Sequence, residues 1–312
     1  MSDDSRIALT VDVEDWYHLP PVTGAPRSRY DTVEDFFEDW DGRYDYLTEP
    51  THRTLDLLDE VNLRATFFVV GDVVDNYSGL VSEIANRGHE IACHGLHHAC
   101  AIDPDTKSPR FTPEEFRDRL RTAKRKLEHV SDQQVTGYRA PNAYIGGWMI
   151  DVLEEVGFTY DSSVARNSLY NKTDSELLDV TSRPYQPEEH GLEPTGDRSI
   201  VEIPWPYYEL GGVKLPAAGG PLARLTPSWF LQAGVRQSLR RGDTVFYFHP
   251  VDLGRDLFPT ENIFRRLFWA RKGDPARRKV RGVLDAFDGD RFVACERLIS
   301  ERLSDHVQVA NV

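Results

Sequence analysis

The segment GHEIACHGLHH, residues 88–98, places two histidines directly after a short apolar run. Residues 90–93 predict a short strand, and His94 and His98 follow it four positions apart. On a helix or helical turn, positions i and i+4 lie on one face, so two imidazoles at this spacing can bind the same metal ion. Surface histidines also fall at this spacing by chance, so the pair gains its weight from the other strand ends of the chain.

Three other predicted strands also end in acidic, basic or imidazole side chains. Their sequences are ALTVDVED at residues 8–15, GYRAP at 137–141 and VFYFH at 245–249. In parallel α/β folds, functional groups gather at the carboxyl ends of the strands, so these ends are expected to meet at one edge of a sheet or barrel. The candidate site residues are Asp12, Glu14, Asp15, His94, His98, Arg139, Asp161 and His249.

Apolar, strand-like runs alternate with amphipathic helical stretches from residue 6 to about residue 250. This alternation predicts a parallel sheet or a barrel. One helix is predicted to begin at Thr112, where Thr112 and Glu115 can form a capping box and Pro113 occupies the first helical position. The predicted strands are residues 7–11, 65–70, 90–93, 135–138, 159–160, 200–203 and 245–248, and the other predicted helices are residues 51–60, 79–87, 146–156 and 226–240.

Two long segments interrupt this alternation. Residues 16–49 hold eight aromatic side chains among many acids, and so long an aromatic connection predicts a folded flap. Residues 166–198 are polar with several Pro and Gly, which predicts an irregular surface segment. Beyond His249 the chain becomes helical and basic, and residues 256–312 are predicted to form a helical extension that packs on a main domain of residues 1–255.

The composition limits the classes of partner. The chain of 312 residues has 51 acidic and 37 basic side chains, and only seven of the basic ones are Lys. An Asp-rich, Lys-poor surface stays hydrated in high salt, so a halophilic source is one interpretation and an ordinary acidic cytoplasmic protein is the other. The net charge of −14 argues against nucleic-acid binding and against a broad electrostatic contact with anionic lipid.

The sequence shows no targeting or membrane-spanning pattern. The apolar stretch at residues 7–11 is interrupted at once by Asp12, so it predicts a strand and not the apolar region of a secretory signal. No apolar run approaches the length of a transmembrane helix. Cys93, Cys100 and Cys295 lack any CxxC spacing, which favours buried free thiols in a reducing compartment. A cytoplasmic location without stable membrane insertion is therefore expected.

The side chains at the strand ends match the requirements of metal-assisted hydrolysis. A carboxylate and two imidazoles hold a borderline divalent ion and leave positions open for water and substrate. A second carboxylate can take the proton from that water. An imidazole on the opposite wall can protonate the leaving amine.

Five motifs in this order resemble the polysaccharide deacetylase superfamily, also known as the NodB-homology or carbohydrate esterase family 4 group. They are TVDVEDW, HEIACHGLHH, YRAP, YDSS and FYFHP. The DVEDW opening, the IPW segment at 203–205, the Gly219-Gly220 turn with Arg224 and the helical tail resemble the subgroup linked to exopolysaccharide biosynthesis. The resemblance covers roughly residues 6–300 and implies a distorted (β/α) barrel of about seven parallel strands with a helical C-terminal extension.

The resemblance also implies roles for single residues. Asp12 matches the family's catalytic base, and Arg139 matches the arginine that orients this base. His249 matches the histidine that acts as general acid. Asp161 lies in the motif that holds the site together from beneath.

The metal ligands follow from the same resemblance, with one departure from the family pattern. His94 and His98 match the two metal histidines. Many members have two adjacent aspartates in the first motif, the second being the ligand, whereas Val13 follows Asp12 here. The carboxylate ligand is therefore Glu14, which shares a strand face with Asp12, or Asp15 if the strand has already turned.

These observations predict a metal-dependent N-deacetylase that acts on an N-acetylated sugar, with zinc as the expected ion. Without an export signal, a nucleotide- or lipid-linked glycan precursor is favoured over mature cell wall, and an oligomer is compatible with the sequence. Two alternatives stay open: an allantoinase-like hydrolase of a small cyclic amide, and a non-catalytic glycan-binding protein with a vestigial site.

Overall fold

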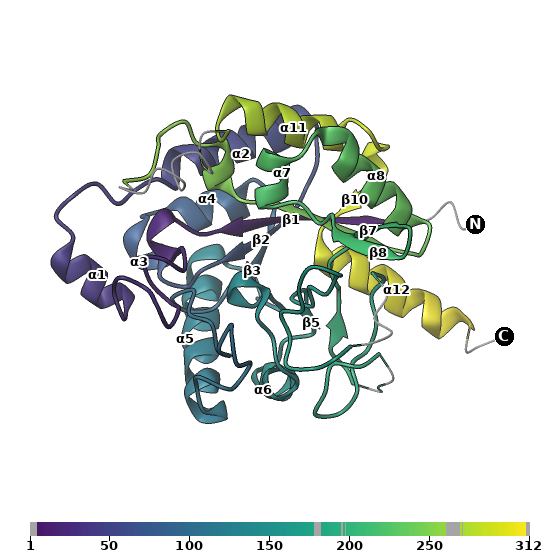
Figure 1. Ribbon diagram of the computed structural model, residues 1–312, viewed down its shortest axis with the longest axis horizontal. Helices are drawn as coiled ribbons and strands as arrows, with labels where there is room; N and C mark the ends of the chain where they lie inside the picture. Colours follow the sequence, from purple (N-terminus) through teal and green to yellow (C-terminus); the bar gives the residue numbers. More distant parts are fainter. Residues whose placement is uncertain are drawn as a thin grey trace.

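The computed structural model describes residues 5–177, 182–194, 196, 198–259, 269 and 271–309, with side chains of the last helix described as far as Arg302. Within these residues, parallel strands form one curved sheet in the order β10-β1-β2-β3-β4-β5-β6, with β9 on the other edge of β1 (Figure 1). The strands are β1 (Ile7–Val13), β2 (Thr66–Val69), β3 (Glu90–Cys93), β4 (Gly137–Tyr138), β5 (Tyr160–Asp161), β6 (Val201–Glu202), β9 (Thr244–Phe248) and β10 (Phe292–Val293).

The sheet curls into a half-barrel with helices outside it, which confirms the predicted distorted (β/α) barrel. All seven predicted strands are present, and β10 adds a short eighth strand beside the amino-terminal half of β1. Alternate residues of β1 face opposite sides, as the pleat requires. Ile7 and Leu9 belong to the large hydrophobic cluster between sheet and helices, whereas Ala8 belongs to a smaller cluster inside the barrel.

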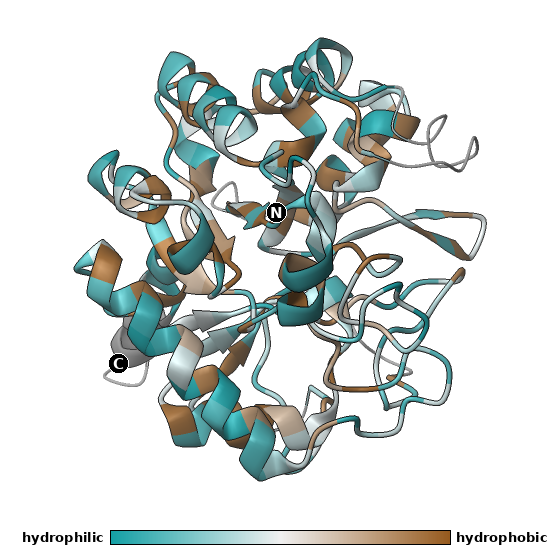
Figure 2. Cartoon of the chain, turned by 90° about the vertical axis from the view of Figure 1, so that its left-hand side faces the viewer, coloured by the Kyte–Doolittle hydropathy of each residue, from teal (hydrophilic) through white to brown (hydrophobic). Residues whose placement is uncertain are grey.

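The five predicted helices are also present, namely α2 (Thr48–Glu60), α4 (Leu80–Asn86), α5 (Pro113–Ser131), α6 (Gly147–Val156) and α8 (Ser228–Leu239). The capping box starts α5 as predicted. The Thr112 side chain accepts a hydrogen bond from the Glu115 amide at 3.2 Å, and the Glu115 carboxylate accepts one from the Thr112 amide at 2.8 Å. The apolar residues of α5, such as Leu120 and Leu127, are buried, and the helices generally turn their hydrophobic sides inward (Figure 2).

An antiparallel hairpin that the sequence analysis did not predict follows β6. It consists of β7 (Tyr207–Leu210) and β8 (Val213–Pro216) and leads into the short helix α7 (Pro221–Leu225). Gly211 and Gly212 form its two-residue loop with φ angles of 58° and 82°. Glycine reaches this left-handed region without strain, so the Gly-Gly pair was a hairpin signal that the sequence analysis missed.

The aromatic residues of segment 16–49 pack against one another. This flap contains the 3-10 turn η1 (Trp16–His18) and the helix α1 (Val33–Asp39). The Trp16 ring lies edge-on to Phe36 and to Trp40, with centroids 5.4 and 5.2 Å away, and Tyr17 stacks on Phe36 at 5.2 Å. Such pairs stabilise the flap, and its buried rings belong to the same large hydrophobic cluster as Ile7 and Leu9.

The C-terminal part returns to the barrel. α11 (Asp274–Leu284) packs on α7, α8 and the short helix α9 (Pro250–Leu253), and β10 joins the sheet. Leu298 and Ile299 of α12 (Cys295–Val309) join Ala8 in the cluster inside the barrel, so α12 closes its amino-terminal end (Figure 1). Residues 260–268, 270 and 310–312 of the predicted extension lie outside the described residues.

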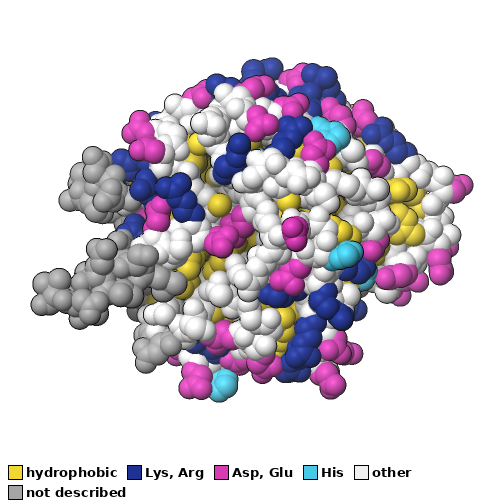
Figure 3. Space-filling model, turned by 180° about the vertical axis from the view of Figure 1, so that it is seen from behind, with side chains coloured by type: hydrophobic (Ala, Val, Ile, Leu, Met, Phe, Trp, Pro, Cys, Tyr) yellow, Lys and Arg dark blue, Asp and Glu magenta, His cyan; other side chains and the backbone are white. Residues whose placement is uncertain are grey.

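The surface carries its charges in mixed groups. On the face seen in Figure 3, acidic and basic side chains lie interspersed over the described surface. Arg87, for example, bonds to Asp56, Asp59 and Glu83. None of the helices in the described ranges is long and apolar enough to cross a bilayer.

Candidate active site

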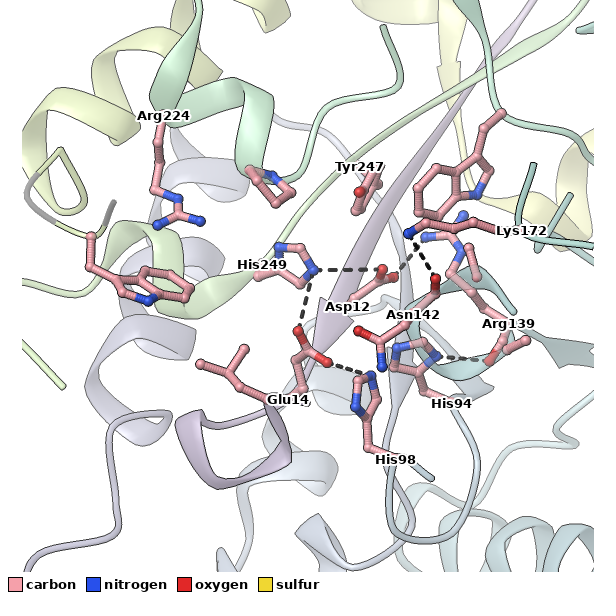
Figure 4. Close-up of a pocket in the computed structure, with 16 residues that line it drawn as sticks. Asp12, Glu14, His94, His98, Arg139, Asn142, Lys172, Arg224, Tyr247 and His249 are labelled. Atoms are coloured by element: carbon pink, nitrogen blue, oxygen red, sulfur yellow. Dashed lines mark hydrogen bonds and ion pairs between the residues drawn. The ribbon is translucent and has the colours of Figure 1, made fainter. Parts of the chain in front are cut away.

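The strand pleat delivers the candidate side chains to one cavity at the carboxyl ends of the strands. Thr10 and Asp12 point from β1 into the barrel, and Glu14 continues the same alternation. His94 lies two positions after Ala92 of β3, which faces the inside of the barrel, so the His94 side chain points to the same side. His249 comes directly after the last residue of β9 and also lines the cavity. Figure 4 shows Asp12, Glu14, His94, His98, Arg139 and His249 around this cavity.

Glu14, His94 and His98 form a cluster that can hold a metal ion. Their ligating atoms all lie within 4.8 Å of one another, and all three side chains are buried. The second ring nitrogen of each histidine is fixed by a backbone carbonyl: His94 Nδ1 donates to Arg139 O at 2.8 Å, and His98 Nδ1 donates to His18 O at 2.9 Å. These bonds leave both Nε2 atoms available as ligands, which is the arrangement that metal-binding histidines usually have.

The buried ligand atoms of this cluster fit a divalent ion. His98 Nε2 lies 2.5 Å from Glu14 Oε2, yet it makes no hydrogen bond of acceptable geometry although it is fully buried. Burial lowers the pKa of His94 to about 4, so this imidazole is neutral at pH 7. Burial alone would raise the pKa of Glu14, but the imidazoles of His98, His249 and His94 hold it below its usual value. A neutral imidazole and an ionised carboxylate are the forms that bind metal.

The two histidines approach each other through a loop and not through a helical turn. Residues 94–98 form no helix, and Gly95 and His98 both have positive φ angles, of 79° and 53°. The left-handed backbone brings His98 back beside His94, so that their ring centroids lie 4.8 Å apart. The four-residue spacing was therefore informative for a different geometric reason than expected.

Asp15, the alternative carboxylate ligand, lies outside the cluster. Its Oδ1 accepts a hydrogen bond from the Trp16 amide at 2.5 Å, and its Oδ2 accepts bonds from the Tyr46 amide at 2.8 Å and the Tyr77 hydroxyl at 2.6 Å. The backbone is still extended at Asp15, so Glu14 keeps the face of Asp12 and Asp15 points the other way. Burial raises the pKa of Asp15 to about 7. The prediction of Asp15 as a ligand is corrected accordingly.

Replacing Glu14 by Ala is expected to abolish tight metal binding, whereas Asp15→Ala should keep it and lose stability. The Asp15 variant should lose about 2–4 kcal/mol of unfolding free energy, because the Tyr46 amide and the Tyr77 hydroxyl lose their acceptor. Elemental analysis and denaturant unfolding of both variants measure the two effects. Weaker metal binding by Asp15→Ala than by Glu14→Ala would contradict this assignment.

Arg139 fixes the orientation of Asp12. Its Nη1 atom donates to Asp12 Oδ1 at 2.6 Å and to Thr10 Oγ1 at 2.9 Å. Its Nε and Nη2 atoms donate to the carbonyl and hydroxyl oxygens of Ser162 at 2.9 and 2.8 Å, and the guanidinium lies 4.1 Å from the Phe68 ring centroid. A buried guanidinium with all these contacts cannot reorient, so the Asp12 carboxylate is held in one position.

Asp161 does not reach the cavity. Its carboxylate accepts a hydrogen bond from Ser163 Oγ at 2.6 Å and lies beside the Glu202 carboxyl. Burial and the adjacent Asp161 raise the pKa of Glu202 well above its usual value, so Glu202 holds a proton. The motif supports the site through Ser162, the neighbour that faces the barrel interior and binds Arg139. The prediction that Asp161 itself is a site residue at this edge is corrected, because the pleat of β5 turns its side chain away from the cavity.

His249 stands on the opposite wall from the two histidines. Its Nε2 lies 3.4 Å from Glu14 Oε1 and 4.0 Å from Asp12 Oδ2, and its Nδ1 bonds to Asp252 Oδ2 at 3.1 Å. Asp252 forms an ion pair with Arg224 Nε at 2.7 Å. Burial lowers the pKa of His249, but Asp252, with smaller contributions from Glu14 and Asp12, outweighs this effect and raises the pKa to about 9. The imidazole is therefore protonated at neutral pH.

Several residues that line or support the cavity were not assigned to the site by sequence reasoning. Asp252 and Arg224 fix His249 from behind, and the three-residue spacing from His249 to Asp252 was a usable signal. Lys172, from the irregular segment 166–198, donates to Asn142 O at 2.9 Å, and burial lowers its pKa to about 8.

The aromatic walls of the cavity come from Trp205, Tyr247 and Trp269, whereas the aromatic rings of the flap do not line the cavity.

Two family models match the chain. One is described as polysaccharide deacetylase and matches residues 32–160, and the other is described as a domain of unknown function (DUF3473) and matches residues 175–295. The second is typical of exopolysaccharide-associated deacetylases. Both spans supply residues to the cavity, and Asp12 and Glu14 come from the strand that precedes them.

Similar proteins support the same fold. The chain is 36% identical over 104 residues to a chitooligosaccharide deacetylase from Bradyrhizobium sp. (strain ANU 289), which is 33% of this chain and 43% of that protein. It thus spans less than half of that relative. A proposed polysaccharide deacetylase structure from Mycobacterium smegmatis matches with a TM-score of 0.61 and 22% identity, covering 98% of this chain and 93% of that one. The PuuE allantoinase structure matches with a TM-score of 0.53 and 16% identity, covering 91% and 85%. At these identities the structural likenesses show the fold alone.

Proposed function

The chain belongs to the polysaccharide deacetylase superfamily, and we propose that it is a metal-dependent hydrolase that removes the acetyl group from an N-acetylated sugar of a polysaccharide or glycan precursor. One observation carries this proposal. A fixed carboxylate, a cluster that fits a metal ion and a protonated imidazole face one another across a single cavity. Metal-assisted amide hydrolysis uses these three functions.

The residues divide the reaction between base and acid. Asp12, held by Arg139, takes a proton from the attacking water while the oxygen of that water adds to the acetamide carbonyl carbon. His249 then gives its Nε2 proton to the sugar nitrogen, the C–N bond breaks, and acetate and a free amine leave. Asp252 keeps the His249 ring oriented through Nδ1. When bound at Glu14, His94 and His98, a divalent ion would act as a Lewis acid toward the carbonyl oxygen and the water.

Zinc is the ion that we propose for this cluster. Two imidazole nitrogens and one carboxylate oxygen form a borderline donor set with room for water and substrate, and zinc commonly occupies such sites. Other divalent ions with similar preferences are expected to substitute in part.

The cavity walls favour a sugar over a small cyclic amide. Trp205 and Tyr247 lie against each other with ring centroids 4.3 Å apart, and both line the cavity. Aromatic faces of this kind suit the flat apolar side of a sugar ring. The fold itself does not separate the two substrate classes, because it is shared with an allantoinase.

Acetate release from a substrate panel tests the proposal. The panel comprises N-acetylated monosaccharides, their oligomers, nucleotide-linked forms and a cyclic amide, each with zinc supplied. We expect acetate and free amine from at least one N-acetylated sugar, and a strongly reduced release of both by the Asp12→Asn variant. Ring opening of the cyclic amide without acetate release from any sugar would replace this proposal with an allantoinase-like function. Inactivity on every substrate with metal bound would favour a non-catalytic glycan-binding protein.

The cytoplasmic location and the halophilic source stay predictions of the sequence.

Removing the charge of Asp252 is expected to shift the alkaline limb of the pH profile. His249 acts as an acid only while protonated, so activity falls as the pH rises through its pKa, which Asp252 raises. In Asp252→Asn this pKa drops, and the alkaline limb of kcat/KM should move to lower pH while the acid limb stays in place. An alkaline limb at the same pH in both proteins would show that Asp252 does not act on His249.

A further inference from the structure

We propose that Lys172 is a specificity-determining residue that binds an oxyanion of the substrate, a phosphate or a carboxylate carried next to the N-acetylated sugar. This inference rests on the proposed function and names the substrate class more closely. It predicts that the deacetylated sugar is charged, as in a sugar phosphate or a uronic acid.

The first support is the position of the Lys172 ammonium. Its side chain lines the same cavity as Asp12, Glu14 and His249, and Figure 4 shows its nitrogen turned toward that cavity. A protonated lysine has three N–H donors. One of them is used by Asn142 O at 2.9 Å, and no other acceptor for Nζ occurs among the residues that the structure describes. Two donors are therefore available to a ligand.

The second support is the pairing of the cations that line the cavity. Arg139 is matched by Asp12 at 2.6 Å, and Arg224 is matched by Asp252 at 2.7 Å. Lys172 forms no ion pair with any carboxylate in the described ranges. Burial lowers the pKa of Lys172, and the one carboxylate that acts on it, after the Cys100 thiol and the Lys107 ammonium, is Glu14, which belongs to the metal cluster. An anionic group on the substrate would supply the missing counter-charge, and hydrogen bonds between charged groups are stronger than neutral ones.

The third support is the fixed aromatic surrounding of Lys172. Its Nζ atom lies 5.3 Å from the Tyr170 ring centroid, 5.4 Å from that of Tyr144 and 6.0 Å from that of Trp205. These rings hold the cation through cation–π contacts. Because Trp205 also lines the cavity, a sugar ring against Trp205 would bring its substituents within reach of Lys172.

Lys172 lies between the two segments that the family models match. The family models match residues 32–160 and 175–295, so residues 161–174 lie between them and are covered by neither. Substrate selection is expected in such segments, because the chemistry of the site is supplied by the barrel and the variation by loops.

Steady-state kinetics with matched substrates test this inference. The anionic substrates are N-acetylglucosamine 1-phosphate and N-acetylglucosaminuronic acid, and the neutral one is methyl N-acetylglucosaminide. KM and kcat are measured for the wild type, Lys172→Met and Lys172→Arg. Lys107→Met is the control, because Lys107 Nζ lies 4.5 Å from the same Tyr144 ring but does not line the cavity.

Lys172→Met is expected to raise KM for an anionic substrate by roughly tenfold or more, as loss of a charge-assisted hydrogen bond does, and to change KM for the neutral substrate little. Lys172→Arg should keep most of the preference, and Lys107→Met all of it. The anionic substrate that is affected identifies phosphate or carboxylate as the group. Equal effects on anionic and neutral substrates, or no effect, would overturn the inference and leave Lys172 a structural tie to Asn142.

Calorimetric binding of the products separates this inference from the proposed function. Glucosamine 1-phosphate, glucosaminuronic acid and glucosamine are titrated into the metal-loaded wild type and Lys172→Met. A preference for either anion that disappears in the variant supports the role of Lys172 even if no acetyl group is released. If the wild type prefers neither anion over glucosamine, the role is refuted even if deacetylation is observed.

Discussion

Replacing Asp12 by Asn is expected to lower turnover by roughly two to four orders of magnitude while the bound ion remains, because general-base deletions have effects of this size. The substitution keeps the shape of the side chain and its contact with Arg139, but it removes the group that accepts the proton of the attacking water. Acetate release and metal content are measured on the same preparations.

The matched control for this variant is Asp15→Asn, an adjacent buried carboxylate outside the cavity. It should keep turnover within about tenfold of the wild type, since Asp15 binds only backbone and tyrosine donors on the far side of β1. If Asp12→Asn lost its metal together with its activity, Asp12 would be a ligand and the division of roles between Asp12 and Glu14 would be incorrect.

Replacing His249 by Ala should damage amide hydrolysis far more than hydrolysis of an activated ester. An amide nitrogen leaves only after protonation, so loss of the acid should cost roughly two to four orders of magnitude on an N-acetylated sugar. An activated acetate ester has a good leaving group and should lose about tenfold or less. Rates on both substrates and the metal content of the variant provide the comparison.

His52→Ala serves as the control for loss of an imidazole. His52 bonds to Glu83 at 2.9 Å on the outer surface and should be replaceable with little effect on either substrate. The general-acid role of His249 would have to be given up if the variant lost amide and ester activity to the same extent while its fold and metal remained normal.

The fold was predictable because hydrophobic periodicity is a local property. The longer strands β1, β2, β3 and β9 contain apolar runs of a few residues, and the capping box at Thr112 marks the start of α5 within four positions. The hairpin at Gly211-Gly212 was equally local and was missed, because its strands carry exposed apolar residues such as Leu210 and lack a clear alternation.

The candidate site was predictable where the pleat alone decides orientation. The face shared by Asp12 and Glu14 follows from their separation by two residues, and the same rule places Asp15 and Asp161 on the other side.

Other parts of the site depend on contacts between distant segments. Arg224 reaches Asp252 across 28 positions and Lys172 reaches Asn142 across 30, so neither pair leaves a trace in local sequence. The return of His98 toward His94 depends on a positive φ at a non-glycine residue, which sequence patterns do not reveal.

Stepwise addition of zinc to metal-free protein tests the central claim most directly, with bound ion and acetate release followed together. In the wild type, both should rise in parallel and level off at one ion per chain, because Glu14, His94 and His98 form a single cluster. In the double variant His94→Ala/His98→Ala, neither should rise. Acetate release by the metal-free wild type, or one tightly bound ion in the double variant, would contradict the account.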